Sequence, residues 1–233
     1  MDEQEYRHYY TIIRDDVYKA RCSFYTYSEI HAFAGASPGN YEKINRGAPF
    51  WEIIQYGLQE SFVVSLGRLF DRDDDSHSIT KLLSATADNP HIFSKAALSR
   101  RKMPDGRMPD WLDAFMADPD VWEPKAGELD FLKGVFAQYI HKIELVCRIR
   151  NKVFAHRDIA THETRQRFDE FVGQAQLADI QSILDDAYDV LEQIDMLYRD
   201  GVKPNLGCYR DRRSEEMRSE ARAVLTSLPQ GGM

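Results

Sequence analysis

The residues best suited to chemistry lie in one short segment, Arg150 to Asp158, with the sequence RNKVFAHRD. Arg150 carries a guanidinium, whose planar fork of donors binds phosphate and stays charged at physiological pH. Asn151 adds a side-chain amide, and His156 adds an imidazole that gains or loses a proton near neutral pH. Together these groups could cleave a phosphodiester without a metal ion, because the histidine can transfer a proton while the arginine stabilises the charge of the transition state.

Positive charge gathers around this segment, although the protein as a whole is acidic. The net charge of −8 argues against a general nucleic-acid coat and leaves only a local basic site. Between residues 142 and 167 there are seven basic and three acidic residues. Such a cluster is usually a solvated helix face. The motif favours a functional interpretation, in which Lys152 and Arg157 hold a nucleic-acid backbone and Asp158 supports them.

A second polar motif, Arg68-Leu69-Phe70-Asp71, ends an apolar stretch. If Arg68 is buried it needs a partner, and Asp71 could provide one from the next turn. This ion pair could be purely structural and close the helix. Alternatively, Arg68 or Asp71 lines a cleft that faces Arg150 and His156. The sequence leaves both interpretations open.

Long amphipathic helices must position these groups. Apolar residues recur at steps of three and four residues, which is typical of one buried helix face. This pattern predicts a first helix that is broken at 34–40, a third that begins near Gly127 and leads into the motif, and a fourth that is ended by Gly201 and Pro204. The three stripes are Tyr6, Tyr10, Ile13, Val17, Ala20, Phe24 and Tyr27; Phe131, Leu132, Val135, Phe136, Tyr139, Ile143 and Val146; and Leu177, Ile180, Leu184, Ala187, Leu191, Ile194 and Tyr198.

The second helix, from Pro49 to Phe70, is apolar on most of its sides and is therefore predicted to be central and buried. Gly57 and Gly67 would let a neighbouring element approach this helix closely. Each glycine makes helix formation less favourable by about 1 kcal/mol relative to alanine. A last short helix is predicted from Ser214 to Leu228.

These elements predict an all-α bundle of four main helices in a single domain over residues 1–233. An insertion at about 72–126 separates the second helix from the third and holds five of the nine prolines, with short helices expected at 79–87 and 93–101. The tail from about 202 to 233 carries the short C-terminal helix.

Metal and cofactor chemistry finds no support in the sequence. An EF-hand loop starting at Asp71 would need glycine at its sixth position and glutamate at its twelfth, where Ser76 and Leu82 stand. No nucleotide-binding glycine loop and no zinc spacing are found. Three scattered cysteines, an acidic N-terminus and the absence of a long apolar run indicate a reduced cytoplasmic protein without a membrane span.

The pattern Arg-Asn-x4-His resembles the signature of the HEPN superfamily, many of whose members are RNases. Combined with Arg68-Leu69-Phe70-Asp71, it resembles the AbiU-like branch, which is associated with abortive phage infection, over roughly residues 5–200. Arg150 and His156 lie about 120° apart on an ideal helix. A two-fold dimer would bring two copies of each into one cleft, as in the composite sites of this superfamily.

The resemblance implies a metal-independent endoribonuclease that acts on RNA and leaves 2′,3′-cyclic phosphate ends. Arg150, Asn151 and His156 would form its catalytic site. A homodimer and a role in phage defence or a toxin–antitoxin system follow from the same resemblance, with an antitoxin or regulatory protein as a partner. The alternative is a non-catalytic HEPN-like module that binds RNA or a partner protein through the same cleft.

Overall fold

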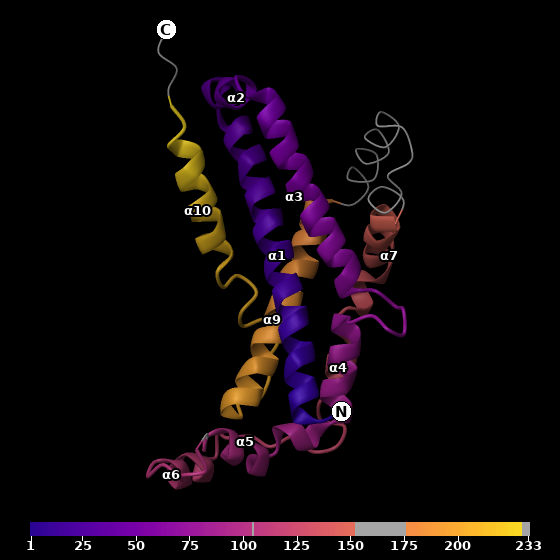
Figure 1. The fold of residues 1–233 in the computed structure, drawn as a ribbon, viewed down its shortest axis with the longest axis vertical. Helices are drawn as coiled ribbons and strands as arrows, with labels where there is room; N and C mark the ends of the chain where they lie inside the picture. The colour runs from indigo at the N-terminus through magenta and orange to yellow at the C-terminus, as the bar shows by residue number, and fades with distance from the viewer. Residues whose placement is uncertain (104, 152–175, 230–233) are drawn as a thin grey trace. The chain divides into compact units, whose positions relative to one another are not determined.

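The computed structural model describes residues 1–103, 105–151 and 176–229. All regular structure in these ranges is helical, which confirms the predicted all-α class. The α-helices (Figure 1) are α1 (Glu3–Ala36), α2 (Pro38–Asn45), α3 (Ala48–Leu69), α4 (Ile79–Asp88), α5 (Lys95–Arg101), α6 (Leu112–Ala117), α7 (Ile140–Ile149), α9 (Leu177–Asp200) and α10 (Ser214–Thr226). The 3₁₀-helices are η1 (Pro90–Phe93), η2 (Asp130–Gly134) and η3 (Ala137–Tyr139).

The contacts between residues group the chain into two compact units, each assembled from separate stretches. The first unit consists of residues 1–15, 69–140 and 185–210, and the second of residues 16–68, 141–184 and 211–233. None of the described helices is long and apolar enough to cross a membrane.

The first helix forms as its apolar stripe predicts. Ile13, Val17 and Ala20 are fully buried on one face of α1. The helix ends where the sequence predicts a break, because Ser37 takes an extended conformation and caps the new helix α2. The Ser37 hydroxyl accepts a hydrogen bond from the backbone N–H of Asn40 at 3.1 Å, and Pro38 occupies the first turn.

The core of the first unit is aromatic. The ring of Tyr6 packs edge-on against Phe93 at 5.5 Å and lies 6.3 Å from the ring of Tyr198, and its hydroxyl shares a 2.8 Å hydrogen bond with Thr86. Gly201 ends α9 in the left-handed conformation, with φ 66°, which confirms the predicted stop. A side chain on residue 201 would also collide with neighbouring apolar residues of this core.

The core of the second unit joins α1 to the C-terminal half of α3. The ring of Phe62 packs against Phe24 at 5.7 Å and against Tyr27 at 5.8 Å. The hydroxyls of Ser23 and Ser61 form a 2.8 Å hydrogen bond beside these rings. This pairing holds the end of α3 that carries the second polar motif.

The prediction that α3 is buried along its length is wrong for its N-terminal half. Phe62, Val63 and Leu66 are buried, but Ile53 is 73% exposed and Phe50 is 59% exposed. Apolar residues on most sides of a helix do not show how much of its length other elements cover. Only the tertiary contacts determine this.

The predicted third helix is shorter than the sequence indicates. The α-helical segment begins at Ile140 rather than near Gly127, and the 3₁₀-helices η2 and η3 precede it. Gly127 adopts the left-handed conformation with φ 83°, and Gly134 lowers the helix propensity of the segment by about 1 kcal/mol. Apolar residues spaced by three and four can be buried by 3₁₀ turns as well as by an α-helix, so the stripe alone overestimated the helix.

The predicted short helices of the insertion and the C-terminal tail are confirmed, with small shifts at their ends. α4 and α5 occupy the two predicted positions, and α10 ends two residues before the predicted limit. The Ser94 hydroxyl caps α5 by accepting a hydrogen bond from the N–H of Ala97 at 3.2 Å.

Candidate functional site

In the second unit, the side chain of Arg150 crosses α3 at Gly67, the residue before Arg68. Nη1 of Arg150 donates a hydrogen bond to the backbone carbonyl of Gly67 at 3.1 Å. Gly67 is buried, and a Cβ atom there would overlap Cδ of Arg150 and lie 3.1 Å from its Cβ. The expected close approach at Gly67 is thus confirmed, whereas a Cβ at Gly57 would meet no described atom within 4 Å.

Arg150 is also bonded to the next residue of the motif. Its Nε donates a hydrogen bond to Oδ1 of Asn151 at 2.9 Å. The two residues follow α7 directly in a π-helical conformation, which is rare and often occurs at functional sites. The carbonyl of Gly67 and the amide of Asn151 therefore orient the guanidinium between them.

The described α-helix before the motif ends at Ile149. The angle of about 120° between Arg150 and His156, which assumes an ideal α-helix, stays a prediction. His156 lies outside the described residues, as do Lys152, Arg157 and Asp158. Their predicted roles stay predictions.

Arg68 lies beside Gly67 but points to solvent. Its side chain is 51% exposed and forms a 2.9 Å ion pair with Asp16 of α1. Sequence reasoning offered Asp71 as the partner of a buried Arg68 and did not consider Asp16. Asp16 precedes the buried Val17, and this position at the border of the apolar stripe is the signal that could have identified it. An ion pair with one exposed partner contributes about 1 kcal/mol or less.

Asp71 organises the loop that follows α3. Its Oδ1 accepts a hydrogen bond from the backbone N–H of Asp73 at 3.2 Å, and its carbonyl accepts one from the hydroxyl of Ser76 at 3.3 Å. The Lys81 ammonium donates to the backbone carbonyls of Asp73, Asp74 and Ser76 in the same loop. Within the described residues, no group of three or more His, Cys, Asp or Glu side chains is arranged to hold a metal ion.

The helix before the motif is held by apolar contacts and by an ion pair on the same side. Ile143, Val146 and Ile149 bury one face of α7. Next to this face, Nζ of Lys142 forms a 2.6 Å ion pair with Asp179 in the first turn of α9. These contacts fix the end of α7, and hence the starting position of Arg150.

A comparison with protein families finds a match that covers most of the chain. The model of the AbiU2 family, HEPN_AbiU2, matches residues 3–217 and so includes nearly all of the described helices. The chain belongs to the AbiU2 family of HEPN proteins. It is thus a HEPN-type module, as the resemblance in the sequence predicted. No curated protein and no solved structure matches the chain.

Proposed function

We propose that this AbiU2-family protein is a metal-independent endoribonuclease. The observation that carries the proposal is the position of Arg150. Its side chain lies on α3 because Gly67 has no side chain there, and Asn151 and the Gly67 carbonyl orient its guanidinium. A guanidinium held in this way loses little conformational freedom when it binds a phosphate. Family membership supports the same reaction, because many HEPN proteins are RNases.

The proposed reaction uses a nucleophile from the substrate. The ribose 2′-hydroxyl of RNA attacks the adjacent phosphorus, the bond to the 5′-oxygen breaks, and a 2′,3′-cyclic phosphate and a 5′-hydroxyl result. His156 removes the proton from the 2′-hydroxyl or donates one to the leaving 5′-oxygen. Arg150 stabilises the negative charge of the transition state, and Asn151 keeps Arg150 in position.

Basic residues around the motif would hold the RNA backbone. Lys152 and Arg157 follow Arg150 in sequence, and Arg68 is exposed next to Gly67. Each could bind a phosphate, and such contacts weaken as salt concentration rises. Asp158 would support these basic groups, and Asp71 would order the loop that follows Arg68.

The protein would act as a homodimer in which two motifs form a composite site. By family analogy, its physiological role would be phage defence or growth arrest in a toxin–antitoxin system, controlled by an antitoxin or another regulatory protein. The reaction would take place in the cytoplasm, where its RNA substrates are found.

The chemistry of the products tests this function. Cleavage of RNA should persist in EDTA, spare DNA and leave 2′,3′-cyclic phosphate ends. A 2′-methoxy group at the cleavage site should block the reaction, because it removes the nucleophile. A need for added magnesium, or cleavage at the methoxy position, would contradict the mechanism.

Substitution of the motif histidine gives the matched test. His156→Ala should reduce the cleavage rate by about 10²–10⁴-fold, as expected for the loss of a general acid or base. His141→Ala is the control, because His141 is an exposed histidine on α7 outside the motif. If wild type and His156→Ala both bind RNA but neither cleaves it, the non-catalytic module is the better description.

A further inference from the structure

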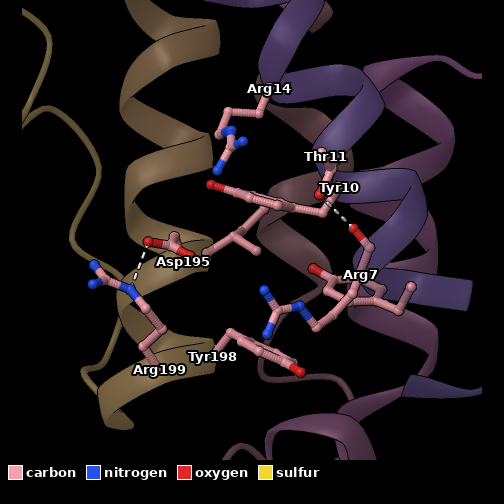
Figure 2. Close-up of a pocket in the computed structure, with 9 residues that line it drawn as sticks. Arg7, Tyr10, Thr11, Arg14, Asp195, Tyr198 and Arg199 are labelled. Atoms are coloured by element: carbon pink, nitrogen blue, oxygen red, sulfur yellow. Dashed lines mark hydrogen bonds and ion pairs between the residues drawn. The ribbon is translucent and has the colours of Figure 1, made fainter. Parts of the chain in front are cut away.

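A cationic pocket lies in the first unit, between the N-terminal turns of α1 and the C-terminal turns of α9 (Figure 2). Arg7 and Arg14, two helical turns apart on α1, contribute to its lining, and Arg199 contributes from α9. The aromatic rings of Tyr10 and Tyr198 line it as well. This pocket shares no residue with the HEPN motif.

The guanidinium of Arg7 is available for a ligand. Figure 2 shows the side chains of Arg7 and Arg14 directed from α1 toward α9. Arg7 is exposed, and its Cζ lies 5.4 Å from the centroid of the Tyr198 ring, a cation–π contact that orients the guanidinium. Within the described part of the chain, Arg7 has no carboxylate at ion-pair distance.

The pocket keeps a positive excess after its own carboxylate is counted. Asp195 forms a 2.7 Å ion pair with Arg199 and is the acidic residue of the lining. Three arginines and one aspartate leave an excess of two positive charges. Asp15, outside the lining, offsets part of the Arg14 charge through an exposed pair at 3.4 Å. The pocket therefore keeps a positive charge and suits an anion.

The size of the cavity restricts what can enter it. The cavity volume is about 50 Å³, and a single water molecule needs roughly 10–15 Å³. The cavity accommodates a group with a few heavy atoms, such as a phosphate, and excludes a whole nucleotide. Forked guanidinium donors match the oxygens of phosphate in geometry as well as in charge.

We infer that this pocket binds the phosphate group of a small phosphorylated ligand, with Arg7 as its principal contact and Arg14 and Arg199 at its edges. The group could come from free inorganic phosphate or from a nucleoside monophosphate whose sugar and base remain outside the cavity. Either source presents anionic phosphate oxygens to the arginines.

Isothermal titration calorimetry with inorganic phosphate, at constant ionic strength, tests the site on the full-length protein. The wild type should bind, and Arg7→Gln should bind about tenfold to a hundredfold more weakly, because a hydrogen bond to a charged group is lost. Arg46→Gln is the control, since Arg46 is exposed and distant in sequence from the lining. It removes the same charge and should bind like the wild type.

A substitution with the opposite expected effect separates binding from folding. Asp195→Asn removes the negative charge and releases Arg199, so phosphate should bind several-fold more tightly. A purely structural role of these residues would weaken binding in both variants. Circular dichroism of each variant confirms that it is folded.

A second titration with a nucleoside 5′-monophosphate distinguishes the two sources. Tighter binding than that of inorganic phosphate would identify the nucleotide as the ligand, and equal or weaker binding would identify free phosphate. Either result supports the site if Arg7→Gln weakens the binding of the ligand. No binding by the wild type, or equal binding by the wild type and Arg7→Gln, would overturn the inference.

Discussion

At the scale of single residues, the candidate site depends on a glycine as much as on its charged groups. Gly67 lowers the helix propensity of α3 by about 1 kcal/mol relative to alanine. Because Gly67 has no side chain, the side chain of Arg150 lies directly on the backbone of α3 and donates a hydrogen bond to the Gly67 carbonyl. The glycine thus links the motif arginine to a rigid helix rather than to a loop.

This contact predicts opposite effects for alanine at the two glycines of α3. Gly67→Ala should destabilise the protein by about 1–3 kcal/mol, because its Cβ would overlap the Arg150 side chain. Gly57→Ala should stabilise it by up to about 1 kcal/mol, because the added methyl group enters open space on an exposed helix position. Urea unfolding of the two variants measures both effects.

Cleavage assays on the same pair connect the contact to the proposed function. Gly67→Ala should cleave RNA more slowly even at temperatures where it is fully folded, because Arg150 is displaced. Gly57→Ala should cleave at the wild-type rate. Equal rates for all three proteins would show that the position of Arg150 on α3 does not matter for catalysis.

At the scale of helices, the C-terminal helix is held in place by a buried carboxylate. Glu29 of α1 is 5% exposed and accepts hydrogen bonds from Arg218 and Arg222 of α10, both at 2.8 Å. Burial alone would raise the pKa of Glu29, but the hydrogen bonds and charges of Arg222 and Arg218 outweigh it, so its pKa lies below the ordinary value. The ionised form is therefore favoured in the folded protein.

The ion pairs of Glu29 with Arg218 and Arg222 predict a pH-dependent loss of stability in Glu29→Gln. A glutamate with a depressed folded pKa contributes fully above its unfolded pKa of about 4.3, and its contribution disappears as the pH falls through the folded pKa. The variant should be less stable than the wild type by about 1–3 kcal/mol near pH 7. The difference should shrink at pH values below about 4.3.

Thermal denaturation across this pH range measures the effect. Glu220→Gln is the matched control, since Glu220 is an exposed glutamate on α10, the helix that Glu29 holds. The unfolding temperature of this variant should follow that of the wild type. A difference between wild type and Glu29→Gln that stays constant with pH would contradict the role of the Glu29 charge.

At the scale of the whole molecule, the proposed homodimer makes each site depend on two chains. If Arg150 of one chain acts with His156 of the other, two inactive variants can complement each other. Arg150→Gln and His156→Ala should each be inactive alone. Mixed after unfolding and refolding together, they should recover a measurable part of the wild-type rate, because mixed dimers assemble one intact arginine–histidine combination.

Analytical ultracentrifugation of the same mixture establishes the assembly. Sedimentation as a dimer together with recovered activity supports a composite site. A species of 27.0 kDa at micromolar concentration would exclude the dimer. A dimer that recovers no activity would place both residues of each site in one chain.

The sequence by itself determined the helical class, the family and the positions of the long helices α1, α3 and α9. The stripes of α1 and α9 recur over many turns, so their faces and their ends at Ser37 and Gly201 follow from local physics. The motif was evident because its chemistry lies in consecutive residues. The close approach at Gly67 was also foreseen, but the same reasoning predicted one at Gly57, where the structure shows none.

Only the tertiary structure decided which residues meet. It chose Asp16 for Arg68, placed Arg150 on Gly67, and left Ile53 exposed although its helix is apolar on most sides. It also replaced the predicted start of the third helix by 3₁₀ turns. The physical reason is common to these cases: spacing along a chain states which residues share a face, whereas pairing and burial depend on neighbours that are distant in sequence.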